Sequence, residues 1–183
     1  MWFMEELDSK AYKNGIEHYQ NRLIEMFRSR TDENTVERVL STFKTRDSCI
    51  RVLFATVAFG MGVDIPDIAI IVNWGLPSSV MTFWQEIGRC GRDGRSALAI
   101  TYPFPRSLNL CPEEKFKKIF KGDDCYRKQV LQMLLLKGMN CTIPISSSAC
   151  GGNDCEDCTC GLCMCCSFCF LKCKCSGKVR AKF

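Results

Sequence analysis

The sequence lacks the segments that would direct a chain to or through a membrane. It has no run of eighteen apolar residues, so we predict no membrane span. Its first ten residues, MWFMEELDSK, carry acids where a signal peptide needs a basic region followed by an apolar one. We therefore expect an intracellular protein with no membrane partner.

The sequence also has little excess charge. Its 183 residues carry a formal net charge of +5, with 46% hydrophobic and 25% charged residues. This composition is ordinary for a soluble globular protein, and the length suffices for one good core with a small appendage. The mild basic excess permits a polyanionic partner without requiring one.

Cysteine is scarce in the first two thirds of the chain and dense afterwards. Three cysteines lie before residue 124, and the other twelve lie between Cys125 and Cys175. Since the chain has no recognisable export signal, metal binding explains this tail better than a disulfide framework does. The only histidine, His18, lies far from these cysteines in the sequence, and we expect it to be a surface residue.

Three apolar segments predict buried strands of a parallel sheet, at residues 50–57, 68–74 and 97–104. The segment DENTVERVLSTFK predicts a helix that is capped by Asp32 or Asn34. SVMTFWQEIG predicts a short helix between the second and third strands, whereas MEELDSKAY and IEHYQNRLIEMF indicate helical or mixed structure. Strands that alternate with helices indicate an α/β fold.

The composition shifts between Arg106 and Cys111, where we place a domain boundary. Residues 1–106 then form the α/β domain, which we expect to be incomplete at its amino end because no opening strand precedes MWFMEELDSK. Residues 107–183 form a helical and cysteine-rich tail. PEEKFKKIF and DDCYRKQVLQMLLL predict two helices there, and residues 138–183 show little helical or strand period.

Two glycine-rich loops carry the candidate chemistry, and the first is TVAFGMGVD. Gly60 and Gly62 permit positive φ and a close approach of the backbone to a phosphate. Thr56 can donate a hydroxyl hydrogen bond to a phosphate, and Asp64 can accept one from a ribose hydroxyl. Taken alone, this loop is explained equally well as a strand that turns through two glycines.

The second loop, GRCGRDG, places Arg89 and Arg92 three residues apart around Gly91. Two guanidinium groups on such a loop can reach a triphosphate and supply positive charge where charge develops in phosphoryl transfer. A basic turn satisfied by surface carboxylates is the simpler explanation, but the two loops in this order and spacing favour the phosphate hypothesis. We expect both loops at the carboxyl ends of strands, where parallel sheets bind ligands.

The segment VLFATVAFGMGVDIPDIAIIVNWGLPSS, followed by FWQEIGRCGRDG, closely resembles motifs V and VI of the RecQ group of superfamily 2 DNA helicases. The resemblance extends over residues 11–104. It implies a second RecA-like domain, a parallel sheet with flanking helices, in a motor that hydrolyses ATP with Mg and moves 3′ to 5′ on DNA. Motif VI supplies the arginine finger in such motors, which the resemblance carries onto Arg92, with Arg89 beside it. Gln85, one turn earlier, is the third catalytic candidate.

Motif V of this family links the nucleotide to the DNA backbone. The resemblance carries the DNA contact onto Thr56. The implied nucleotide-binding residues are Gly60, Gly62, Asp64, Arg89 and Arg92.

The segment EMFRSRTDENT resembles the motif IV region of the same family. The resemblance implies that Ser29 and Thr31 contact DNA phosphates. Arg28 stands where the family often has histidine, and its guanidinium can also bind phosphate.

The family often follows the motor with a zinc-binding subdomain, which takes one cysteine from a helix and three from a later loop. Cys125 in DDCYRKQVL stands at the helical position, although Tyr126 replaces an arginine of the family's Cys-Arg-Arg. The resemblance implies that CGGNDCEDC supplies the other ligands, which are Cys150, Cys155 and Cys158. A rival set uses the pair Cys166 and Cys169, and the alternatives to one site are a second metal or a low-complexity tail.

Neither G-x-x-x-x-G-K-[ST] nor Asp-Glu-x-His occurs in the sequence. These elements belong to the first RecA-like domain of this motor class, so we expect that domain to be a missing partner. The isolated chain is then predicted not to hydrolyse ATP. The competing hypotheses are a non-catalytic nucleic-acid-binding and zinc-binding module, and a degenerate helicase remnant. The family also leads us to expect a nuclear location and a role in DNA repair or recombination.

Overall fold

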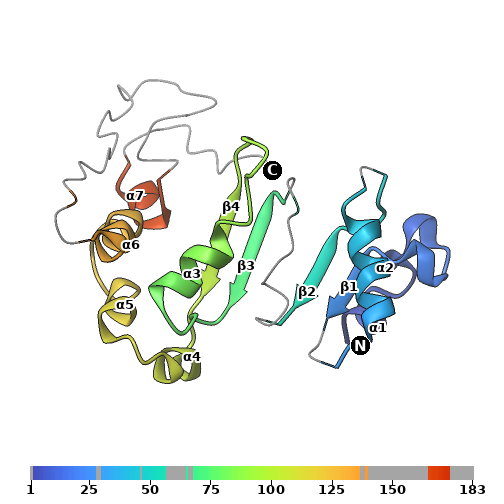
Figure 1. Ribbon diagram of the computed structural model, residues 1–183, viewed down its shortest axis with the longest axis horizontal. Coiled ribbons are helices and arrows are strands. Elements are labelled where there is room, and N and C mark those ends of the chain that lie inside the picture. Colours follow the sequence, from blue (N-terminus) through green and yellow to red (C-terminus); the bar gives the residue numbers. More distant parts are fainter. Residues whose placement is uncertain are drawn as a thin grey trace. The chain divides into compact units, whose positions relative to one another are not determined.

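The structure is a computed structural model that describes residues 2–27, 30–45, 47–56, 65, 68–136, 139 and 165–173. The chain divides into two compact units, Met1–Ile65 and Pro66–Phe183, and each is described here by itself (Figure 1). The predicted domain boundary near residue 106 stays a prediction. None of the described helices is long and apolar enough to cross a membrane.

The first unit builds a small two-stranded parallel sheet with a helix against it. Its elements, in chain order, are α1 (Trp2–Leu7), η1 (Asp8–Ala11), η2 (Lys13–Gly15), η3 (Tyr19–Asn21), β1 (Ile24–Phe27), α2 (Glu33–Phe43) and β2 (Val52–Ala55). In the β1–β2 ladder Ile24 lies opposite Val52 and Phe27 opposite Ala55. Val39 of α2 packs with Phe27 and Ile50, which forms the buried core of this unit.

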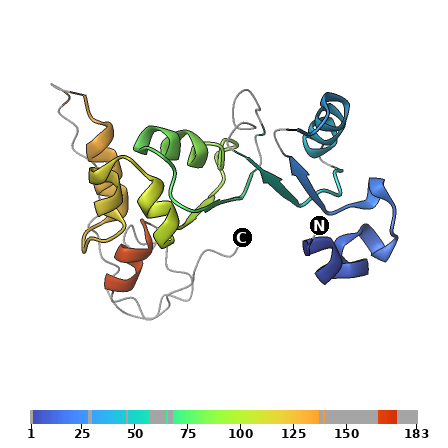
Figure 2. The same cartoon turned by 90° about the horizontal axis from the view of Figure 1, so that it is seen from below.

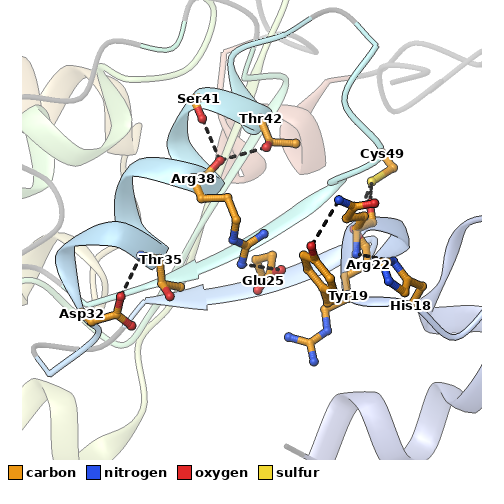
Figure 3. A network of polar contacts seen from close by, with 11 residues as sticks. His18, Tyr19, Arg22, Glu25, Asp32, Thr35, Arg38, Ser41, Thr42 and Cys49 are labelled. Carbon is orange, nitrogen blue, oxygen red and sulfur yellow. Dashed lines mark hydrogen bonds and ion pairs between the residues drawn. The ribbon is translucent and has the colours of Figure 1, made fainter.

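Polar contacts tie α2 to β1 and to the segment before the helix (Figure 3). Asp32 begins α2 by accepting a hydrogen bond from the backbone N–H of Thr35 at 2.9 Å, which confirms the predicted cap. Arg38 of α2 lies 3.8 Å from the buried carboxylate of Glu25 in β1. Its guanidinium also lies 5.7 Å from the centre of the Tyr19 ring. A buried carboxylate needs such a cationic partner, so this pair fixes the helix on the strand.

The second unit contains another parallel strand pair, followed by a group of helices. Its elements are β3 (Ile70–Trp74), α3 (Val80–Ile87), β4 (Leu98–Tyr102), α4 (Pro105–Leu110), α5 (Glu114–Ile119), α6 (Tyr126–Leu134) and α7 (Ser167–Lys172). In the β3–β4 ladder Ile70 lies opposite Leu98 and Trp74 opposite Tyr102. The helix α3 is therefore a crossover between two parallel strands.

One hydrophobic core joins α3 to the helices of the tail. Leu76 and Val80 pack with Phe116, Ile119 and Val130, so residues on both sides of position 106 share this core. Ring contacts run through α3, α5, α6 and α7, which Figure 2 shows grouped within the second unit. The rings, each within 6.3 Å of the next, are Phe83, Phe116, Phe120, Tyr126 and Phe168.

The three predicted strands are confirmed in position as β2, β3 and β4, and the predicted helices as α2, α3, α5 and α6. The expectation that these strands are buried is wrong for the chain by itself, in which Val52 of β2 and Ile70, Val72 and Trp74 of β3 are exposed. The strand β1 was not predicted, because IEHYQNRLIEMF carries no clean alternation and reads as helical or mixed. The expectation of little regular structure after residue 138 is wrong for α7. That helix buries Cys169 and is followed by buried Cys173, which an aliphatic periodicity does not detect.

Candidate functional site

The arginine loop, residues 89–94, lies between α3 and β4. Two backbone hydrogen bonds join this region to the residues just before β3: Gly91 N donates to Ile68 O at 3.1 Å, and Leu98 N donates to Ala69 O at 2.9 Å. The loop therefore lies at the amino ends of β3 and β4, and the expectation that it lies at a carboxyl end is wrong. The reason is topological, since a segment that follows a crossover helix re-enters a parallel sheet at the amino end of the next strand.

Two glycines of this loop adopt backbone angles that other residues rarely take. Gly91 has φ of +70° and Gly94 has φ of +82°. A Cβ atom at Gly91 would also lie 3.1 Å from Cβ of Ala97. The spacing of these glycines is thus what allows the chain to make this turn.

The turn gathers positive charge next to α3. Arg92 is exposed, and its Nε donates to the carbonyl of Gly88 at 3.1 Å. Arg89 is half-buried near Glu86. Burial raises the pKa of the Glu86 carboxyl, while the charge of Arg89 acts in the opposite direction. Gln85 is exposed on α3. Arginines on a backbone-defined turn are suited to an anionic ligand such as a phosphate.

A third arginine, Arg95, directly follows the arginine loop and is paired with Asp93 inside it, and the sequence analysis did not single it out. Arg95 Nε donates to Asp93 Oδ2 at 2.6 Å, and Arg95 N donates to Asp93 Oδ1 at 3.0 Å. Hydrogen bonds from Arg95 hold the pKa of the Asp93 carboxyl below its ordinary value. The signal was present as D-G-R, an acid two residues before an arginine across a glycine.

The remaining helicase-like positions belong to the first unit or lie outside the described residues. Thr56 is exposed directly after β2, and Thr31 is half-buried just before the Asp32 cap. Their predicted contacts with DNA stay predictions. The predicted residues outside the described part of the chain are Arg28, Ser29, Gly60, Gly62 and Asp64.

Four cysteines come together in the tail. The Sγ atoms of Cys125, Cys165, Cys166 and Cys169 all lie within 4.8 Å of one another, and we call these residues the cysteine cluster. The Sγ atom of Cys125 lies 3.5 Å from that of Cys165 and 3.9 Å from that of Cys166. Zn–S bonds of about 2.3 Å in a tetrahedral centre place sulfur atoms roughly 3.8 Å apart, so the cluster fits zinc in size and ligand type.

The amino end of α6 favours negative charge in this cluster. Cys125 caps α6 by accepting a hydrogen bond from Lys128 N at 3.4 Å. Burial alone would raise the pKa of the Cys166 thiol, but hydrogen bonds from backbone N–H groups, with that of Cys169 the strongest, lower it below its ordinary value. Burial and the Cys125 thiol raise the pKa of Cys165 to about 12. A bound cation would be needed to hold the Cys165 thiol as a thiolate.

The cluster contains one residue of the favoured zinc set together with the rival pair. Cys125 belongs to the favoured set, and the structure brings Cys166 and Cys169 of the rival pair to it. The other favoured ligands, Cys150, Cys155 and Cys158, lie outside the described residues. Sequence reasoning missed Cys165, whose signal was its direct adjacency to the Cys-x-x-Cys pair.

The helicase conserved C-terminal domain family matches residues 3–94, which include the arginine loop and half of the chain. The chain belongs to this family. Among its relatives, ATP-dependent helicase wrn-1 of Caenorhabditis elegans is 43% identical over 68 residues, which make up 37% of this chain and 6% of the relative. ATP-dependent helicase SGS1 of Saccharomyces cerevisiae is 47% identical over 103 residues, covering 45% of this chain and 7% of the relative. Probable ATP-dependent DNA helicase RecS of Bacillus subtilis is 39% identical over 74 residues, covering 40% and 15%.

The family match and these relatives identify the chain as a C-terminal portion of a RecQ-type superfamily 2 helicase. The predicted RecA-like α/β fold with parallel strands is confirmed with it. The chain spans no more than 15% of the length of the three relatives named above.

Proposed function

We propose that this chain supplies the arginine-bearing part of an ATP-dependent DNA helicase that moves 3′ to 5′ on DNA. ATP and Mg are held by a first RecA-like domain that carries the P-loop, and Arg92 reaches the triphosphate from this chain. The observation that carries the proposal is the arginine loop, in which two left-handed glycines present Arg89 and Arg92 beside α3. A loop with this spacing has little use in a protein that only binds nucleic acid.

The chemistry asked of this chain is electrostatic. Mg·ATP supplies the phosphoryl group, and the charge that spreads over its oxygens in the transition state is stabilised by Arg92. Arg89 stands beside it, and its charge acts on the partly buried carboxyl of Glu86. Gln85 links the arginines to neighbouring groups. Gly60, Gly62 and Asp64 contact the nucleotide.

DNA contacts are assigned to the helicase motifs of the first unit. Thr56 follows β2 directly, and Thr31 precedes the cap of α2, so both stand at the ends of regular elements. Hydroxyl groups at such positions can donate hydrogen bonds to phosphates without reading sequence. Arg28 and Ser29 complete the proposed set. A nuclear location and a role in DNA repair or recombination follow from the same proposal.

The test joins this chain to a P-loop-bearing first domain from a RecQ-type helicase and measures DNA-dependent ATP hydrolysis. Arg92→Gln is expected to lower kcat about 1000-fold, the order of magnitude of an arginine finger. The matched control, Arg95→Gln, removes the same charge directly after the loop and is expected to change kcat by much less. An Arg92→Gln enzyme as active as the control would overturn the assignment, as would Mg-dependent ATP turnover by the isolated chain.

A second candidate function is a zinc-dependent nucleic-acid-binding module without motor activity, and the cysteine cluster is the observation that favours it. We propose that the cluster holds one Zn²⁺ through the four thiolates of Cys125, Cys165, Cys166 and Cys169. Cys166→Ser is expected to lower the bound zinc measured by mass spectrometry, whereas Cys155→Ser leaves it unchanged. The reverse result would assign the zinc site to the loop of Cys150, Cys155 and Cys158.

A further inference from the structure

The helix α5 is amphipathic and firmly anchored in the second unit. Phe116 is fully buried and Ile119 is 3% exposed, and both belong to the core shared with α3 and α6. The exposed residues of the segment 114–121 are Glu114 and three lysines at three-residue spacing. We call Lys115, Lys118 and Lys121 the lysine face.

Three carboxylates near the lysine face are engaged elsewhere. Glu113 Oε2 accepts a hydrogen bond from Val80 N at the start of α3, at 2.8 Å. Glu114 forms an ion pair with Lys117. Asp124 forms an ion pair with Lys128, with 3.6 Å between Oδ2 and Nζ. Among the described residues, no ion pair joins the lysine face to a carboxylate, so its positive charge remains available to an external partner.

Lysines of this face act electrostatically on the carboxyl of Glu114 in α5. The pKa of the Glu114 carboxyl lies below its ordinary value because of its hydrogen bond to Lys117 first, with the charges of Lys118 and Lys121 contributing. Lys118 and Lys121 of the lysine face therefore act on one local region. Lys115 and Lys118 are separated by about 4.5 Å along the axis of α5, at 1.5 Å per residue, and Lys121 follows the end of the helix.

We propose that the lysine face binds the phosphate backbone of duplex DNA, outside the helicase motifs. B-DNA presents one charge per about 1.7 Å of its axis, so several phosphates lie within the span of this face. Lysine ammonium groups are hydrated point charges on flexible stems, which suits phosphate binding without base reading. The inference rests on the proposed function, because it takes DNA as the polyanion that this chain meets.

The test measures binding of the full chain to a short duplex DNA between about 50 and 200 mM salt. Replacing Lys115, Lys118 and Lys121 together by Gln is expected to reduce the salt slope by roughly 2–3, at about 0.9 per phosphate contact. Affinity at the middle of this salt range is expected to fall at least about 10-fold. Replacing the same three lysines by Arg is expected to preserve the slope, which shows that the effect is one of charge.

The matched control removes three exposed lysines of the first unit, Lys10, Lys13 and Lys44, again by changing each to Gln. Equal losses in the two glutamine variants would overturn the inference, because net charge alone would explain them. An unchanged slope in the lysine-face variant would overturn it and leave the proposed function standing. Absence of DNA binding by the unaltered chain would overturn the inference, while the Arg92 experiment tests the motor independently.

Discussion

The arginine loop and the cysteine cluster are two sites built in opposite ways. The loop consists of consecutive residues, and its shape is fixed by two glycine angles and by the bond from Gly91 N to Ile68 O. The cluster joins Cys125 to Cys165 across 40 positions of the chain, and a cation is needed to hold Cys165, whose pKa is raised to about 12, as a thiolate. The comparison shows that a site of consecutive residues can be predicted from residue spacing. A site whose residues lie far apart in the sequence depends on packing and on its ligand.

Removal of the metal is expected to give the largest difference in local stability between the two sites. Zinc contributes about 10–16 kcal/mol to folding of isolated zinc-finger peptides, so a chelator should open the region around Cys125. Hydrogen exchange at the amino end of α6 is expected to rise at least about 100-fold, while the amide of Gly91 keeps its protection. The helix α2 of the first unit serves as the internal control. Equal loss of protection in α2 would contradict the expectation.

The substitution Phe116→Ala is expected to destabilise the arginine loop and the cysteine cluster together, and so to remove the difference between them. Phe116 is fully buried, and its ring centroid lies 5.5 Å from that of Phe83 in α3 and 5.4 Å from that of Phe120. Truncation of such a phenylalanine costs about 3–5 kcal/mol of the free energy of unfolding, measured in urea. Phe3→Ala, at a residue 39% exposed in the first unit, is the control with the smaller expected loss. Comparable losses in the two variants would exclude a central role for Phe116.

The sequence predicted the arginine loop and most of the elements that carry it, for a physical reason. Three strands and the helices α2 and α3 show a regular apolar pattern, and Asp32 is a good cap. The strand β1 and the helix α7 lack such a pattern, because pairing with β2 and burial of Cys169 stabilise them instead. The same limit applies to the cysteine cluster, since spacing alone does not select among so many thiols.

Two glycine substitutions sharpen the idea that the loop is fixed by its backbone. Gly91→Ala meets both an unfavourable φ and a contact of 3.1 Å with Cβ of Ala97, whereas Gly94→Ala meets the unfavourable φ alone. We expect about 1–3 kcal/mol of destabilisation for Gly91→Ala and a smaller effect for Gly94→Ala. Thermal unfolding measures both. A Gly94→Ala variant as unstable as Gly91→Ala would mean that close packing at Gly91 contributes nothing.

The smallest expected effect concerns the Asp93–Arg95 pair, and it depends on pH. The pKa of Asp93 is lower in the folded chain, so its stabilisation is present above the ordinary value near 3.8 and is lost as pH falls through the lowered pKa. Asp93→Asn is therefore expected to be slightly less stable than the unaltered chain at neutral pH and equal to it in strong acid. Melting temperatures at several pH values test this. A difference that grows in acid would contradict the sign.

The central claim is that Arg92 acts on the transition state of ATP hydrolysis, and one binding measurement tests it directly. The two-domain enzyme, made by joining this chain to a P-loop domain, is titrated with ADP alone and with ADP plus aluminium fluoride, which mimics the transferring phosphoryl group. Arg92→Gln is predicted to weaken binding of the aluminium fluoride complex about 1000-fold and to leave ADP binding nearly unchanged. Equal weakening of both, or of neither, would contradict the account.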